Sequence, residues 1–175
     1  MTVLIPTRAG IFTARFSGAG LAKLAFPNQS SSTQECRPSV ECETALRRKW
    51  SALTKAGLEA VLIGELPGEL PPLDVCAGTD FQKCVWSALR RIPAGQTKSY
   101  SEIAAEIGSA KATRAVGQAC GANPIPVLIP CHRVLAAGGK LGGFSGGLDW
   151  KRRLLSVEGV LSQPLNGETQ RRFSL

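Results

Sequence analysis

The sequence predicts an α+β protein: a small N-terminal antiparallel sheet with one helix, followed by an all-α C-terminal domain that contains a helix-turn-helix. Two observations predict this order. Short apolar runs separated by turn residues fill the first 26 positions, a pattern typical of strands. Beyond residue 78 the apolar residues recur instead at helical spacing, and a proline-rich stretch separates the two patterns.

The N-terminal runs predict a β-hairpin and a helix packed on it. Apolar residues cluster at 3–5, 11–16 and 21–26, and the last two runs flank a Ser-Gly-Ala-Gly turn. Residues 27–41 are rich in Ser, Gln and Pro and predict a surface loop. Apolar residues then recur at helical spacing from Leu46 to about Gly57, where we expect the helix to end.

The segment from Leu66 to Leu73 marks the junction between two domains. Its three prolines lack backbone donors and fix φ, so it cannot continue a helix or form a central strand. We therefore expect a supporting domain at residues 1–76, a second domain at 77–160 and a basic tail at 161–175.

Three helices are predicted early in the second domain. The pairs Thr79 with Gln82 and Ser99 with Glu102 have the spacing of capping boxes and start the first two. A third helix is expected at about 111–120, and the turn at Gly108 makes the last two a helix-turn-helix. On spacing alone, two packed helices that bind no nucleic acid would look the same.

Composition limits the classes of partner. A net charge of +8 suits a polyanion, although a basic protein without such a partner would also carry it. No apolar run approaches the roughly 18 residues of a membrane span, so we expect a cytoplasmic protein with no membrane partner. Six cysteines without an export signal are expected to be reduced. No cluster of thiolates and imidazoles suggests zinc, and we predict no metal and no cofactor.

The single histidine, His132, directly follows Cys131. A thiol is a nucleophile as its thiolate, which a nearby base can generate. Neighbouring residues do not face each other on regular structure, so we expect a tight turn at Pro130 or a bridging water to connect the two side chains. For an arbitrary Cys-His pair, the plain alternative is a buried thiol beside a satisfied loop histidine.

The surroundings of this pair resemble a known family. Residues 123–134, Asn-Pro-Ile-Pro-Val-Leu-Ile-Pro-Cys-His-Arg-Val, resemble the active-site signature of the O6-alkylguanine-DNA alkyltransferases. The similarity extends over about residues 79–159, through 93–100, 114–117, 145–147 and 158–159, whereas residues 1–75 match only in outline. Some members of this family hold a structural zinc through N-terminal histidines that this sequence lacks.

The resemblance implies a role for each matching residue. Cys131 would be the alkyl acceptor, His132 and Glu158 would complete a relay through a water, and Tyr100 would donate to guanine N3. The helix with Arg114, Ala115, Gly117 and Gln118 would enter the minor groove of double-stranded DNA, with Arg114 filling the space of the rotated guanine.

Further positions would recognise the base or support the site. Ser145 would bind O6, and the main-chain carbonyls of Cys131 and Val134 would accept from the exocyclic amine. Asn123 and Arg133 would be structural, and Phe144 stands where some members have another aromatic residue.

The activity implied is a single, irreversible transfer of the alkyl group from O6-alkylguanine to Cys131, on a base that has left the stack. We expect a monomer, with cooperative binding to DNA as an open alternative. A non-catalytic lesion binder or DNA-binding regulator remains an alternative, although such relatives replace the cysteine that is present here. A cysteine hydrolase is a weaker one, because its histidine would lie far from the cysteine in sequence.

Overall fold

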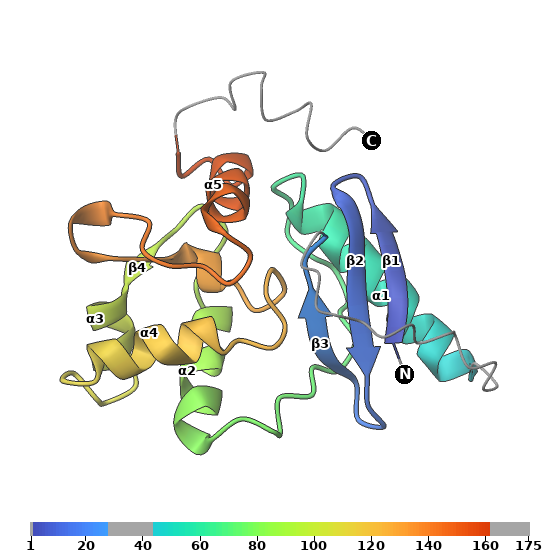
Figure 1. The fold of residues 1–175 in the computed structure, drawn as a ribbon, viewed down its shortest axis with the longest axis horizontal. Coiled ribbons are helices and arrows are strands. Elements are labelled where there is room, and N and C mark those ends of the chain that lie inside the picture. The colour runs from blue at the N-terminus through green and yellow to red at the C-terminus, as the bar shows by residue number, and fades with distance from the viewer. Residues whose placement is uncertain (1, 28–43, 162–175) are drawn as a thin grey trace.

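The structure is a computed structural model that describes residues 2–27 and 44–161. Figure 1 shows two lobes: a sheet with a long helix, and a group of shorter helices beside it. The predicted fold class is confirmed. The predicted loop at 27–41 and the tail at 161–175 lie, except for their first residues, outside the described residues.

The N-terminal lobe is a three-stranded antiparallel sheet covered by one helix. Its strands are β1 (Thr2–Thr7), β2 (Gly10–Phe16) and β3 (Leu21–Ala25), in the order β1-β2-β3. Inward-facing residues such as Phe12 and Ala14 alternate with exposed ones along β2, so one face of the sheet is buried.

Helix α1 (Ala45–Val61) begins at the N-cap Thr44, whose side chain accepts from the backbone of Arg47. The expectation that this helix ends at Gly57 is wrong, since it continues for one more turn. Gly57 is instead a site of close packing: a Cβ there would lie 2.5 Å from a methyl carbon of Leu70.

The C-terminal lobe contains α2 (Asp80–Arg90), α3 (Tyr100–Glu106), α4 (Thr113–Gly121) and α5 (Leu148–Val157). Both predicted capping boxes are present, at Thr79 and at Ser99, and each fixes the first residue of its helix. Helices α3 and α4 form the predicted pair around Gly108, whose φ of 72° favours glycine. On α2, Cys84 is exposed, whereas Val85, Trp86, Ala88 and Leu89 are buried.

One short ladder was not anticipated in this lobe. Strands β4 (Lys98–Ser99) and β5 (Val134–Leu135) pair in parallel. The ladder fixes the start of α3, and therefore Tyr100, beside the turn that carries Cys131 and His132.

The two lobes are connected by backbone contacts as well as by the chain. Leu24 of β3 donates to the carbonyl of Pro124, 2.8 Å away, and Leu21 pairs with the linker at Leu73. One cluster of buried apolar residues extends from the sheet through the helices. The domain boundary at 76/77 stays a prediction. Within the described ranges no helix is both long and apolar enough to cross a membrane, and the cytoplasmic location stays a prediction too.

Candidate active site

Cys131 opens a short 3-10 turn, Cys131–Arg133, at the end of a buried loop. Asn123 holds this loop from the end of α4: its side-chain amide donates to the carbonyl of Ile129 at 2.8 Å, and its oxygen accepts from the backbone of Ile125. The same amide lies 3.1 Å from the sulfur of Cys131. Asn123 therefore does more than tie the loop, because its N–H group is directed at the Cys131 sulfur, a contact that sequence reasoning missed.

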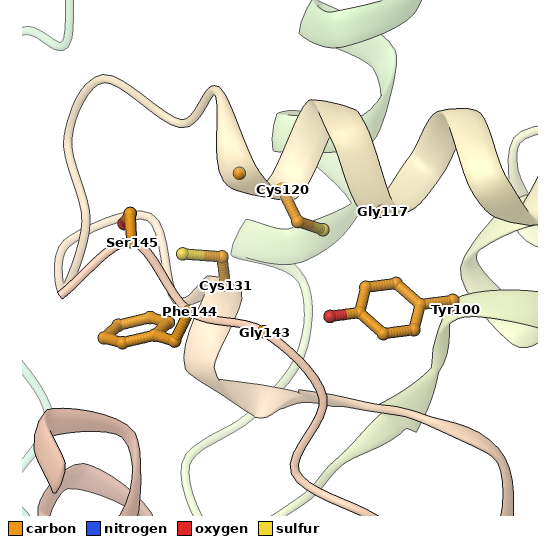
Figure 2. Close-up of a pocket in the computed structure, with 8 residues that line it drawn as sticks. Tyr100, Gly117, Cys120, Cys131, Gly143, Phe144 and Ser145 are labelled. Atoms are coloured by element: carbon orange, nitrogen blue, oxygen red, sulfur yellow. The ribbon is translucent and has the colours of Figure 1, made fainter. Parts of the chain in front are cut away.

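The thiol of Cys131 faces a cavity of about 430 Å³, within the range of sites for small molecules. Figure 2 shows Tyr100 on one side of this cavity and Phe144 and Ser145 on the other, with α4 across it. The lining is completed by Gly117, Cys120, Gly121 and Gly143. The structure thus brings together four sequence-predicted residues: Cys131, Tyr100, Ser145 and Gly117.

Behind the cavity, His132 and Arg133 share one carboxylate. Nε2 of His132 lies 2.9 Å from Oε1 of Glu158, and both side chains are almost fully buried. Arg133 donates to both oxygens of Glu158 from Nε, at 3.1 and 3.0 Å, and from Nη2 at 2.7 Å. Its remaining nitrogen Nη1 donates to the carbonyl of Ile92. Arg133 therefore fixes Glu158, and Glu158 fixes the imidazole.

This pairing determines the tautomer of His132. A carboxylate only accepts hydrogen bonds, so Nε2 carries the proton and Nδ1 carries the lone pair. Nδ1 is buried and has no hydrogen-bond partner among the described protein groups. The side chains of Cys131 and His132 form no hydrogen bond with each other in the described part of the chain. The residue that follows Cys131 thus carries a buried basic nitrogen with no hydrogen-bond partner among the described protein groups.

Burial controls the resting protonation of these groups. It raises the pKa of the Cys131 thiol to about 11, against the opposing effects of the Asn123 amide and the Lys151 ammonium. Burial also lowers the pKa of His132, although Glu158 acts in the other direction. For Glu158, burial favours the neutral acid, but hydrogen bonds from His132 and Arg133 hold its pKa at about 2. At neutral pH the site therefore holds a thiol, a neutral imidazole and a carboxylate.

Lys151 is a buried cation that was not among the site residues predicted from the sequence. Its side chain, on α5, is fully buried, and Nζ donates to the carbonyls of Val134 at 2.7 Å, of Leu141, and of Gly143 at 3.5 Å. Val134 directly follows the Cys131–Arg133 turn, whereas Leu141 and Gly143 belong to the segment that precedes α5. Burial lowers the pKa of Lys151, while the neighbouring thiols of Cys131 and Cys120 favour its charged form. A lysine is rarely placed so deep, and no local pattern marks this one.

Tyr100 is held between two glycines. A Cβ at Gly142 would lie 3.3 Å from its hydroxyl oxygen, and a Cβ at Gly117 would lie 3.9 Å from its ring. Burial raises the pKa of Tyr100, so the phenol keeps its proton and remains a hydrogen-bond donor. Its hydroxyl points into the cavity, toward the side that carries Cys131 (Figure 2).

The expected main-chain acceptors are already engaged. The carbonyl of Val134 accepts from Lys151, and the carbonyl of Cys131 accepts from the backbone N–H of Val134. Each carbonyl oxygen has two lone pairs, so a second donor can still be accommodated. The exposed Ser145 lines the cavity opposite Tyr100.

Helix α4 presents a polar and small-residue surface. Arg114 and Gln118 are exposed on it, whereas Ala115 and Gly117 are half-buried. Val116, Ala119 and Cys120 form its buried face. The helix thus has a free outer surface that carries Arg114 and an inner surface that closes the cavity. Within residues 2–27 and 44–161, no three His, Cys, Asp or Glu side chains are grouped to hold a metal ion.

Comparison with known proteins identifies the family. The family model described as 6-O-methylguanine DNA methyltransferase, DNA binding domain, matches residues 80–160. A methylated-DNA–protein-cysteine methyltransferase of Methanosarcina acetivorans is 52% identical over 105 residues, which are 58% of this chain and 65% of that protein. The crystal structure of Mycobacterium tuberculosis OGT in complex with DNA is 40% identical, with a TM-score of 0.72 over 89% of this chain and 90% of that one. The chain belongs to the O6-methylguanine-DNA methyltransferase family.

Membership of the methyltransferase family extends to the N-terminal lobe. The crystal structure of the Mycobacterium tuberculosis O6-methylguanine methyltransferase is 36% identical and aligns over 97% of this chain and 98% of that one, with a TM-score of 0.65. The sequence alignment to the Methanosarcina relative, by contrast, spans a little under two thirds of that relative. Both lobes thus follow the family fold, while the closest sequence similarity lies in the C-terminal part.

Proposed function

We propose that this protein repairs alkylated DNA by transferring the alkyl group from O6 of guanine to its own Cys131. The observation that carries the proposal is the environment of the sulfur: it faces a cavity, accepts from Asn123, and lies beside a histidine whose tautomer Glu158 fixes. A nucleophile, a base and a group that orients the base are the parts that transfer to a cysteine requires.

The proton and electron balance follows from the resting state. The proton of Cys131 passes through a water to Nδ1 of His132, the atom without a protein partner among the described groups. A sulfur lone pair attacks the alkyl carbon, a C–S bond forms, and the C–O6 bond breaks with its electron pair on the guanine. The neutral phenol of Tyr100 then donates toward N3 and offsets the charge that develops on the base.

The buried position of Cys131 argues that the base must leave the duplex. Its side chain is 3% exposed and lies in the wall of a cavity behind α4, so a stacked guanine could not reach it. The exposed outer surface of α4, with small residues and Arg114, suits the minor groove, where Arg114 would fill the gap in the stack. The net charge of +8 favours the DNA backbone.

A thioether on Cys131 would have no easy route back to a thiol, so each molecule would act once. Cys120 lines the same cavity, but burial raises its pKa to about 12 and no hydrogen bond to its sulfur appears among the described residues. It is therefore the weaker nucleophile of the two. Double-stranded DNA with an O6-alkylguanine is the partner, and we expect a monomer without a cofactor.

The test is the intact mass of the protein after incubation with duplex DNA that contains one O6-methylguanine. We expect a gain of one methyl group, mapped to Cys131 and lost in Cys131→Ala. The matched control is Cys120→Ala, the second thiol of the cavity, which should still gain the methyl group. Lesion-dependent binding without a mass gain would instead indicate a non-catalytic binder, and a second methyl group per molecule would contradict the single use.

A further inference from the structure

An aromatic contact joins the N-terminal sheet to the wall of the active-site cavity. Phe26 follows β3 and is 3% exposed. Its ring meets that of Phe144 edge to face, with centroids 5.6 Å apart at 66°. It also packs on Trp150 at 4.9 Å and on Phe12 at 5.6 Å. Phe26 is therefore anchored on two sides and meets the cavity wall on the third.

The same ring fills the space behind Gly146. A Cβ at Gly146 would lie 2.5 Å from Cε2 of Phe26, and the three nearest atoms all belong to the Phe26 ring. The φ of Gly146 lies outside the left-handed region, so its backbone conformation does not demand glycine. Phe26 therefore limits how closely residue 146 can approach the sheet.

Phe144 and its neighbours form the side of the cavity toward which the Cys131 sulfur points (Figure 2). Gly143, Phe144 and Ser145 line the cavity, whereas Phe26 does not. The segment 140–147 contains no helix or strand, so contacts from other elements must hold it in place. An alkyl carbon attacked by this sulfur would lie on the same side, and any larger alkyl group would extend toward Phe144.

We infer that Phe26, a residue of the N-terminal lobe, sets the largest alkyl group that the cavity accepts, by holding Phe144 and Gly146 in position. This inference rests on the proposed alkyl transfer to Cys131. Phe26 acts through Phe144 and is a positioning residue. Without its ring, the wall could retract into the space left behind, and groups larger than methyl would fit beside the sulfur.

The experiment compares single-turnover rates on duplexes that contain O6-methylguanine or O6-benzylguanine. We expect Phe26→Ala to raise the benzyl-to-methyl rate ratio by about fivefold or more, with Phe26→Leu in between. The matched control is Phe16→Ala, because Phe16 is also 3% exposed in the sheet but stacks on Trp50 of α1. It should lose comparable stability in thermal unfolding and leave the ratio unchanged.

A double-mutant cycle tests the contact itself. Gly146→Ala should push the wall away from Phe26 and into the cavity, and lower the benzyl-to-methyl ratio. Adding Phe26→Ala should restore the ratio, since the three nearest obstructing atoms all belong to Phe26. An unchanged ratio in Phe26→Ala, an equal change in Phe16→Ala, or no rescue of Gly146→Ala would overturn the inference. If the wild type gained no methyl group at all, the proposed function would be wrong and the inference would fall with it.

Discussion

The two lobes bury very different side chains. Among the described residues of the N-terminal lobe, the one buried polar side chain is Thr54, whose hydroxyl donates to Trp50 in its own helix. The C-terminal lobe buries Asn123, His132, Arg133, Lys151 and the carboxylate of Glu158. Removing charges from water costs several kcal/mol per ion unless partners compensate. The N-terminal lobe is thus mainly apolar support, while the C-terminal lobe retains costly buried groups in and behind the wall of the cavity that Cys131 lines.

The largest effect should come from removing the buried cation. Lys151→Met keeps most of the side-chain volume but leaves the carbonyls of Val134, Leu141 and Gly143 without their donor. It also removes the positive charge that favours the Cys131 thiolate. We expect a rate of alkyl transfer about 100-fold lower and a free energy of unfolding about 1–3 kcal/mol lower. Single-turnover kinetics and urea unfolding measure the two.

The control for that change is Lys83→Met, which removes a lysine paired with Asp80 at the surface of α2. It should alter neither quantity appreciably. A Lys151→Met variant with the wild-type rate would show that the buried charge of the C-terminal lobe serves packing alone.

A smaller effect is expected from Glu158→Gln, and it should depend on pH. The pKa of Glu158 is about 2 in the folded protein and about 4.3 in an unfolded chain. The carboxylate therefore contributes stability above the unfolded value, and that contribution is lost as pH falls from about 4.5 to about 2. The wild type should lose about 3 kcal/mol of stability relative to Glu158→Gln across this window.

Denaturant unfolding of both proteins at a series of pH values measures this difference. If the free energy of unfolding fell equally with pH in both proteins, the carboxylate would not be held by His132 and Arg133 as described. At neutral pH the same variant should transfer the alkyl group about 10- to 100-fold more slowly, because a glutamine no longer fixes the imidazole tautomer.

The smallest effect should come from Thr54→Val in the N-terminal lobe. The lost hydroxyl bonds only within α1, so the free energy of unfolding should fall by about 1 kcal/mol and the transfer rate should not change. A clear loss of rate in this variant would contradict the division of roles between the lobes. Phe26 would be the exception to that division, since it reaches from the sheet to the cavity wall.

Sequence reasoning succeeded where the cause is local. The capping boxes at Thr79 and Ser99 join residues three apart, and both are present as predicted. The apolar run that predicted β2 and the helical spacing that predicted α4 likewise reflect neighbouring residues. The proximity of Glu158 to His132 is different: 26 residues separate them, and it was expected only from the family resemblance.

The features that the sequence did not predict depend on contacts between residues that are far apart in the chain. Lys151 would ordinarily be assigned to the surface. Its acceptors come from β5 and from the segment before α5, which are brought together by the tertiary structure. The contact between Phe26 and Phe144 joins residues far apart in the chain and in different lobes. The helix end at Gly57 was predicted from apolar spacing along the chain, whereas the structure shows that the glycine accommodates the close approach of Leu70.

The burial of Cys131 also affects how long its thiol stays unmodified before the protein meets a lesion. With its pKa at about 11, about one thiol in 10⁴ is ionised at neutral pH, and peroxides and stray electrophiles react with the ionised form. The cavity therefore preserves the sulfur during the search for a lesion. If the protein acts once, as proposed, every molecule oxidised by chance would be one repair fewer. The burial that makes the sulfur hard to ionise would then extend the time for which each molecule stays usable.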